Sequence, residues 1–132
     1  MKNELTYSFN KLKSASLRLK ESTEKTLDEL DRDGVIKRFE FTFELFWKAI
    51  KALLEHEGFD CAGPRSCIKA GARRGFLIDG EMILDMLEDR NKTTHIYNEA
   101  TAQAIFNNIK ERYVELIENN IELIENYIIS EK

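Results

Sequence analysis

Residues 35–57, VIKRFEFTFELFWKAIKALLEHE, are the most hydrophobic part of the 132-residue chain and decide its fold. On a helical wheel the large apolar side chains of this stretch fall on one broad face. The face comprises Val35, Ile36, Phe39, Phe43, Phe46, Trp47, Ile50, Leu53 and Leu54. Gly58 follows as a typical C-terminal stop, because glycine readily adopts the left-handed conformation that ends a helix. The stretch therefore predicts a long central helix that is largely buried.

A second apolar strip, made of Phe41, Leu45 and Ala52, lies on the opposite side of this helix. Either neighbouring helices of the same chain cover the strip, or Phe41 and Leu45 belong to a homodimer interface, because a small bundle rarely covers both sides of one helix. The sequence does not favour one of these alternatives over the other. On the flank between the two faces, Glu44 and Lys48 are spaced as a favourable ion pair on a solvated surface.

The rest of the chain has the apolar spacing of amphipathic helices. A first helix is expected over residues 5–26, with Leu5, Phe9, Leu12 and Leu19 on one face, and a polar connection over 27–34 follows it. Asp33 or an earlier aspartate is the expected cap of the central helix. The sequence thus predicts an all-α protein in which these two helices are neighbours.

Three further helices are expected after residue 63. Pro64 begins a short one that ends near residue 74, and Asp79 caps one that runs into Arg90. The last runs from about residue 98 nearly to the end of the chain and closes a bundle. Asn120 lies beside its apolar face and is expected to point outward.

Length and composition limit the possible functions. The chain has the size of one domain, residues 1–132, and its net charge of −4 argues against bulk nonspecific binding to nucleic acid. Cys61 and Cys67 match no common zinc spacing and are expected to be reduced thiols, so we expect neither a metal site nor another cofactor. No signal peptide or membrane-spanning run is recognisable, and a cytoplasmic protein is the expectation.

The short helix after Pro64 carries the only concentrated positive patch of the sequence. Arg65, Lys69 and Arg73 are four residues apart and share one face, with Arg74 beside them. Such a run of charges is usually a solvated surface. In a protein with a candidate nuclease site it is also where the phosphate backbone of RNA would lie.

The chemically most capable side chains occupy the segment between the last two predicted helices. Arg90 and His95 would point about 140° apart on an unbroken helix, so they converge only if the helix ends between them. Arginine binds phosphate with two hydrogen bonds, and histidine transfers protons near neutral pH. The pair therefore suits metal-independent cleavage of RNA, in which the 2′-hydroxyl attacks the adjacent phosphorus. The alternative for His95 is a purely structural, hydrogen-bonded histidine. Tyr97 follows two residues later, and from the residues alone it is expected either to lie exposed beside this site or to pack on the start of the last helix.

Two stretches resemble the HEPN superfamily, specifically the nucleotidyltransferase substrate-binding proteins that are close to HepT-type toxins. The first is residues 90–97, RNKTTHIY, which fits an Arg-x4-His-x-Tyr signature with asparagine directly after the arginine. The second is residues 38–48, RFEFTFELFWK, which resembles the aromatic, Glu-containing second helix of that family. The similarity extends in order over essentially the whole chain.

This resemblance implies an antiparallel up-and-down four-helix bundle with a short additional helix, a homodimer, and a small nucleotidyltransferase as partner. It implies that Arg90 and His95 cut RNA across the dimer cleft without metal and that Asn91 orients them. Tyr97 occupies the position to which the partner transfers AMP in the toxin branch. The leading hypothesis is a toxin–antitoxin-like module with this ribonuclease activity, and the alternative is a noncatalytic subunit that presents a nucleotide or another substrate to the nucleotidyltransferase.

Overall fold

The computed structural model describes residues 2–95 and 98–131, and all regular secondary structure in this part of the chain is helical. The helices are α1 (Lys2–Glu24), α2 (Glu29–His56), α3 (Pro64–Arg73), α4 (Gly80–Thr93), α5 (Glu99–Asn108), the π-helical segment η1 (Ile109–Tyr113) and α6 (Val114–Ser130). The expected all-α fold class is confirmed. None of the helices in these two ranges combines the length and the apolar character needed to cross a lipid bilayer.

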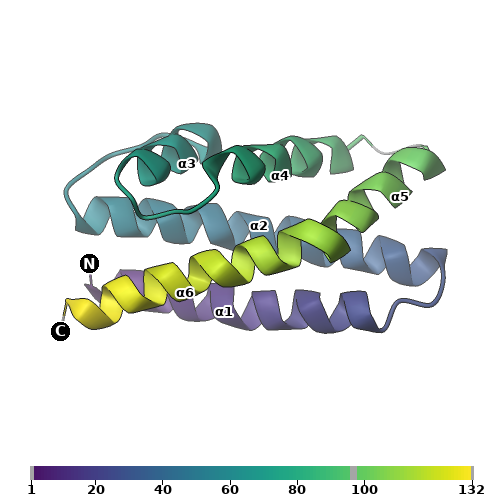
Figure 1. Ribbon diagram of the computed structural model, residues 1–132, viewed down its shortest axis with the longest axis horizontal. Helices are drawn as coiled ribbons and strands as arrows, with labels where there is room; N and C mark the ends of the chain where they lie inside the picture. The colour runs from purple at the N-terminus through teal and green to yellow at the C-terminus, as the bar shows by residue number, and fades with distance from the viewer. Residues whose placement is uncertain (1, 96–97, 132) are drawn as a thin grey trace.

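Four long helical elements run alternately up and down (Figure 1). Helices α1 and α2 form one antiparallel pair, α4 runs antiparallel to α2, and α5, η1 and α6 form one long bent element that returns along the bundle. The short helix α3 lies beside α4 and packs against α2. The arrangement is the expected antiparallel four-helix bundle with one short additional helix. The α1–α2 connection and the junction between α4 and α5 lie at the same end of the bundle.

The core confirms the faces that the apolar spacing predicted. Eight of the nine residues predicted on the broad face of α2 are buried, and Trp47 is partly buried. The four predicted core residues of α1 are also buried. The Phe39 ring stacks on the Tyr113 ring of η1 with their centroids 5.7 Å apart. Each large apolar side chain buried in this way stabilises the fold by roughly 1.5–3 kcal/mol. Helices α1, α3, α4 and α5 pack on α2, and α6 packs on α1.

Helix α2 begins six residues earlier than the sequence predicted. Its N-cap is Asp28, whose carboxylate accepts a hydrogen bond from the Asp31 backbone N–H at 2.9 Å. Acidic residues in the first turn, Glu29 and Asp31, interact favourably with the N-terminal end of the helix dipole. Of the predicted caps, Asp33 lies inside the helix, as does Gly34, and the alternative of an earlier aspartate is confirmed by Asp28. The polar connection is therefore shorter than expected.

The expectation of reduced cysteines is wrong for this structure, in which Cys61 and Cys67 form a disulfide. Cys67 lies on α3, and Cys61 lies in the loop that leads into this helix. Pro64 begins α3 and turns the chain back, so that the two Cα atoms are 5.1 Å apart. The pairing depends on this turn, which the spacing of the cysteines alone does not reveal.

Gly71 lets α3 approach the core closely. A Cβ atom at this position would lie 3.0 Å from Leu77 Cδ1 and 3.2 Å from Ile50 Cγ2. Both distances are tighter than ordinary van der Waals contact, so a side chain here would push α3 away from α2.

Asn120 is fully buried, contrary to the expectation that it points outward. Its amide oxygen accepts a hydrogen bond from the Ile78 backbone N–H at 2.8 Å, and its amide nitrogen donates to the Ile78 and Leu116 carbonyls at 3.2 and 2.9 Å. Ile78 lies in the loop before α4. Asn120 therefore satisfies the backbone of a loop that packs on the last helical element, which a helical wheel of that element cannot show.

Candidate functional site

The candidate site begins at the C-terminal end of α4, and the predicted helix break is confirmed. Helix α4 ends at Thr93, between Arg90 and His95. The hydroxyl of Thr93 donates to the Arg90 carbonyl at 2.6 Å, and the Thr94 hydroxyl donates to the Asn91 carbonyl at 3.0 Å. These hydroxyls satisfy carbonyls that lose their helical partners at a helix end.

Helix α5 starts again after a short gap. The Asn98 side-chain oxygen accepts from the Ala100 and Thr101 backbone N–H groups at 2.7 and 3.2 Å, which makes Asn98 an effective N-cap. Tyr97 and Ile96 lie outside the described residues. The site is thus a corner that is closed on both sides by side-chain caps.

The Arg90 guanidinium is held from three directions. Its Nη2 forms an ion pair with Oε2 of Glu44, its Nη1 donates to Oδ1 of Asn91 at 3.2 Å, and its Cζ lies 5.7 Å from the centre of the Phe43 ring. The Arg90 side chain is 29% exposed, so it still faces solvent. A half-buried guanidinium with fixed orientation is well suited to bind an oxyanion, provided that the anion displaces or joins the Glu44 carboxylate.

His95 is exposed, and its imidazole forms no hydrogen bond or ion pair with residues 2–95 or 98–131. A hydrogen bond thus links the side chains of Arg90 and Asn91, but no hydrogen bond or ion pair links either of them to the His95 imidazole. If the histidine and the arginine act on one substrate, either the substrate or a second copy of the chain must bridge them.

Glu44 was missed as part of the site. The predicted ion pair with Lys48 is present, with Nζ and Oε1 3.5 Å apart, and the Glu44 side chain is one-third exposed. Its other carboxylate oxygen binds Arg90, which lies 46 residues further along the chain. A contact over this separation depends on how α2 packs against α4, so the local pattern gave no sign of it.

A buried carboxylate directly before Arg90 was also missed. Asp89 is 8% exposed, and its Oδ2 accepts from the Tyr113 hydroxyl at 2.6 Å and from Asn108 Nδ2 at 2.9 Å. Asn108 directly precedes the π-helical segment η1, and Tyr113 is its last residue. Burial, and then the hydrogen bond to Asp89, raise the pKa of the Tyr113 hydroxyl far above its ordinary value. The phenol therefore stays a donor to Asp89 and ties the end of α4 to the last helical element.

A second ion pair, between a buried arginine and an exposed glutamate, lies at the same corner. Arg32 is 5% exposed and donates to both carboxylate oxygens of Glu99, each at 3.1 Å. The hydrogen bond to Glu99 raises the pKa of Arg32 against the opposing effect of burial, and the same bond lowers the pKa of Glu99. The pair fixes the start of α5 against the start of α2 and lines a cavity of about 340 Å³ together with Thr93 and Asn98.

Two residues of the predicted positive patch have partners in the structure, and two do not. Arg65 forms an ion pair with Glu88 of α4, and the Arg74 guanidinium stacks on the Phe59 ring with its Cζ 3.5 Å from the ring centre. Lys69 and Arg73 are exposed and form no ion pair within the part of the chain that the structure describes. Of the four predicted phosphate ligands, these two have free charge.

The second apolar strip of α2 is only partly covered. Phe41 is 60% exposed, whereas Leu45 and Ala52 are half-buried against the core. Neighbouring helices thus cover part of the strip, and Phe41 remains open to solvent in the isolated chain.

One group among the described residues has side chains of the kind that bind metals. His56 Nε2 lies 3.0 Å from Oε1 of Glu131 and 3.9 Å from Oε2 of Glu57, and ligand atoms of all three residues fall within 4.8 Å of one another. The hydrogen bond between His56 and Glu131 at the C-terminal end of α2 accounts for this grouping.

Comparison with known proteins identifies the family. Residues 7–126 match the family described as nucleotidyltransferase substrate binding protein like. A crystal structure of a protein from Thermus thermophilus superposes with a TM-score of 0.73 at 36% sequence identity, covering 89% of this chain and 98% of that one. None of the curated proteins compared with the chain is significantly similar to it. The chain belongs to the nucleotidyltransferase substrate-binding-protein-like family.

Proposed function

We propose that this protein is the helical partner subunit of a small nucleotidyltransferase in a toxin–antitoxin-like module and that it cleaves RNA without metal at Arg90 and His95. The proposal places the chain in the HEPN superfamily, close to HepT-type toxins. The observation that carries it is the end of α4 between Arg90 and His95, with the Arg90 guanidinium held in place by Glu44 and Asn91. Membership of the nucleotidyltransferase-associated family supports the partner.

The chemistry follows from the two side chains. The His95 imidazole removes the proton of a ribose 2′-hydroxyl, and the resulting oxygen attacks the adjacent phosphorus. The bond from phosphorus to the 5′-oxygen breaks as the protonated imidazole gives its proton to that oxygen, which leaves a 2′,3′-cyclic phosphate. Arg90 stabilises the additional negative charge on the phosphoryl oxygens in the transition state, and Asn91 keeps the guanidinium oriented. Because Arg90 and His95 share no contact in one chain, two copies across a dimer cleft complete the site.

RNA cleavage by the purified protein tests this mechanism. Cleavage should persist in chelator and fall by about 10²–10³-fold in Arg90→Ala, which is the usual loss when one donor to a developing oxyanion is removed. Arg112→Ala is the matched control, because Arg112 is an ion-paired arginine of η1 that does not contact the corner. Activity of His95→Ala equal to that of the wild type would remove His95 from the mechanism.

The homodimer proposed above is expected to form through the partly covered strip of α2. Phe41→Glu or Leu45→Glu should give monomers in sedimentation velocity, because a buried unpaired carboxylate opposes association. Leu17→Glu is the control, since Leu17 is also 60% exposed but lies on α1. A dimer that survives both changes on α2 would place the interface elsewhere.

Regulation by the partner is proposed at Tyr97. The phenol oxygen attacks the α-phosphorus of ATP, pyrophosphate leaves, and the bound AMP blocks the phosphate site beside His95. Intact mass after incubation with the nucleotidyltransferase and ATP should rise by one or more AMP units in the wild type but not in Tyr97→Phe. Tyr7→Phe is the control, because Tyr7 is 65% exposed and lies near the start of α1. Equal modification of Tyr97→Phe would move the acceptor to another residue.

We further propose that the positive patch of α3 guides RNA to the site. Lys69 and Arg73 are the groups with free charge, so Lys69→Gln and Arg73→Gln should each weaken RNA binding and reduce the slope of log affinity against log salt by about one. Arg65→Gln and Arg74→Gln should have smaller effects, because their charges already have partners. Equal effects at all four positions would indicate that these contacts open on binding.

A noncatalytic subunit that presents a nucleotide or another substrate to the nucleotidyltransferase is the second candidate function. The ion pair with Glu44 favours it, because this carboxylate already compensates the charge of Arg90. Expression of the chain with and without its partner separates the two candidates. Growth arrest that the partner relieves supports the ribonuclease toxin, and normal growth together with a stable complex of the two chains supports the presenting subunit.

A further inference from the structure

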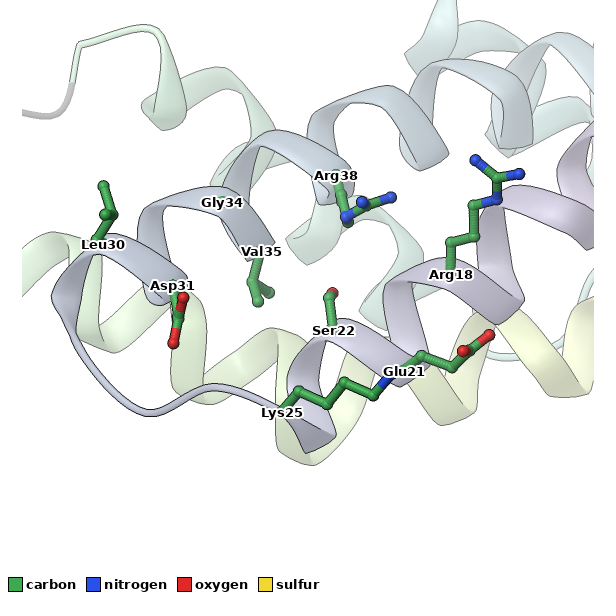
Figure 2. Close-up of a pocket in the computed structure, with 9 residues that line it drawn as sticks. All are labelled: Arg18, Glu21, Ser22, Lys25, Leu30, Asp31, Gly34, Val35 and Arg38. Atoms are coloured by element: carbon green, nitrogen blue, oxygen red, sulfur yellow. The ribbon is translucent and has the colours of Figure 1, made fainter.

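A surface groove of about 500 Å³ lies where the end of α1 meets the beginning of α2, and its lining includes no residue of the Arg90–His95 corner. Its volume is within the range of small-molecule sites. Figure 2 shows Arg18 and Arg38 together at one end of the groove and Leu30 and Asp31 at the other, with Val35 between them. The groove thus has a cationic end and an end with an apolar wall.

The charges at the cationic end are uncompensated. Arg18, Arg38 and the nearby Lys25 are exposed and form no ion pair within residues 2–95 and 98–131. By contrast, Arg32 and Arg90 are each neutralised by a glutamate. In a chain with a net charge of −4, two neighbouring arginines without a carboxylate partner leave room for an external anion.

Of the two acidic residues that line the groove, Asp31 lies at the other end and Glu21 lies at the same end as Arg18 (Figure 2). Asp31 is engaged in the α1–α2 turn, where its Oδ2 accepts from the Leu27 backbone N–H at 3.1 Å. Glu21 follows Arg18 by three residues on α1, and its carboxylate forms no ion pair with Arg18, Arg38 or any other described residue. The two arginines therefore remain the groups that face an incoming ligand.

Gly34 keeps the groove open. It lies inside α2, where glycine costs about 1 kcal/mol relative to alanine, yet a Cβ atom added there meets no atom within 4 Å. No packing against a neighbouring helix requires a glycine at this position. Its one local consequence is that the wall of the groove carries no side chain at position 34, beside Val35.

We propose that this groove binds a nucleoside phosphate. The phosphates are bound by Arg18 and Arg38, whose planar guanidinium groups donate paired hydrogen bonds to phosphate oxygens. The base lies over Leu30, which is 79% exposed, and Val35, which is 1% exposed, adds only a small part of this wall. The site goes beyond the proposed ribonuclease and does not depend on it. A mononucleotide is favoured over RNA, because the groove is bounded and combines one short cationic end with one apolar wall.

Calorimetric titration of the full chain with ATP, adenosine and inorganic triphosphate tests the proposal. ATP should bind more tightly than either of the other two compounds, because only ATP uses both ends of the groove. Arg18→Gln and Arg38→Gln should each weaken ATP binding by about tenfold. Lys37→Gln is the matched control, since Lys37 precedes Arg38 on α2, is exposed and does not line the groove. Its affinity for ATP should equal that of the wild type.

A steric variant separates loss of binding from loss of folding. Gly34→Leu should keep or raise the thermal stability of the chain, because leucine is the better helix former, and should abolish ATP binding by filling the groove. Unchanged ATP binding in a folded Gly34→Leu protein would overturn the proposal. So would no binding of ATP up to about 1 mM, equal affinity for inorganic triphosphate, or RNA binding that depends on Arg18 and Arg38 in the absence of ATP binding.

Discussion

The hydrogen bond between the Asp89 carboxylate and the Tyr113 hydroxyl should contribute measurably to the free energy of unfolding. Asp89→Ala removes an acceptor that serves both Tyr113 and Asn108 and leaves the phenol, 1% exposed, without a partner. A hydrogen bond to a charged group contributes about 1.5–3 kcal/mol, so the variant should lose about 3 kcal/mol of the free energy of unfolding. For a chain of this length the loss corresponds to a fall in Tm of about 10 °C.

A double-mutant cycle isolates the contact. Tyr113→Phe keeps the ring stacked on Phe39 and removes only the hydroxyl, so it should cost about 1.5 kcal/mol. The two changes together should cost less than their sum, with a coupling energy of about 1–2 kcal/mol from urea unfolding. Asp89→Asn is a milder control, because it keeps one acceptor oxygen. Additivity to within about 0.5 kcal/mol would show that the buried pair does not hold α4 against η1 in the way described.

Three further predictions concern the stability of the chain. Asn120→Ala should lower the free energy of unfolding by about 2–3 kcal/mol in urea, whereas Asn119→Ala, at an exposed position, should change it by less than about 0.5 kcal/mol. Tyr113 has a raised pKa in the folded state, so its contribution is complete below about pH 10 and is lost as the pH rises further; the thermal midpoint should fall less steeply there in Tyr113→Phe. Reduction of the disulfide, or Cys61→Ser and Cys67→Ser, should cost about 2 kcal/mol by loop entropy, and an unchanged Tm in reductant would contradict this.

The fold could be predicted from the sequence because it depends mainly on local periodicity. The apolar faces of α1 and α2 repeat every three to four residues, and burial of those faces leaves few alternatives to a bundle. The start of α2 was misplaced because several aspartates precede it and each of them is a reasonable cap. Only the packed structure selects Asp28.

The features that the sequence did not reveal all depend on contacts between distant segments. Asn120 is buried because the loop around Ile78 lies on α6, and Glu44 binds Arg90 because α2 and α4 pack side by side. For the site, the helix end between Arg90 and His95 was predictable from the propensities of the intervening residues. The partners that orient Arg90 were not, since no local pattern encodes them.

The π-helical segment η1 is equivalent to a one-residue insertion in an otherwise continuous helix. Deletion of one residue between Asn108 and Val114 would restore an α-helix and turn everything after it by about 100° relative to α5. Asn98 would still cap the start of α5. Asn120, however, would turn away from the loop before α4 and lose its hydrogen bonds to the Ile78 backbone. The extra residue therefore sets the rotation of α6 relative to α5 about the helix axis. This segment should accordingly tolerate substitutions far better than changes in length.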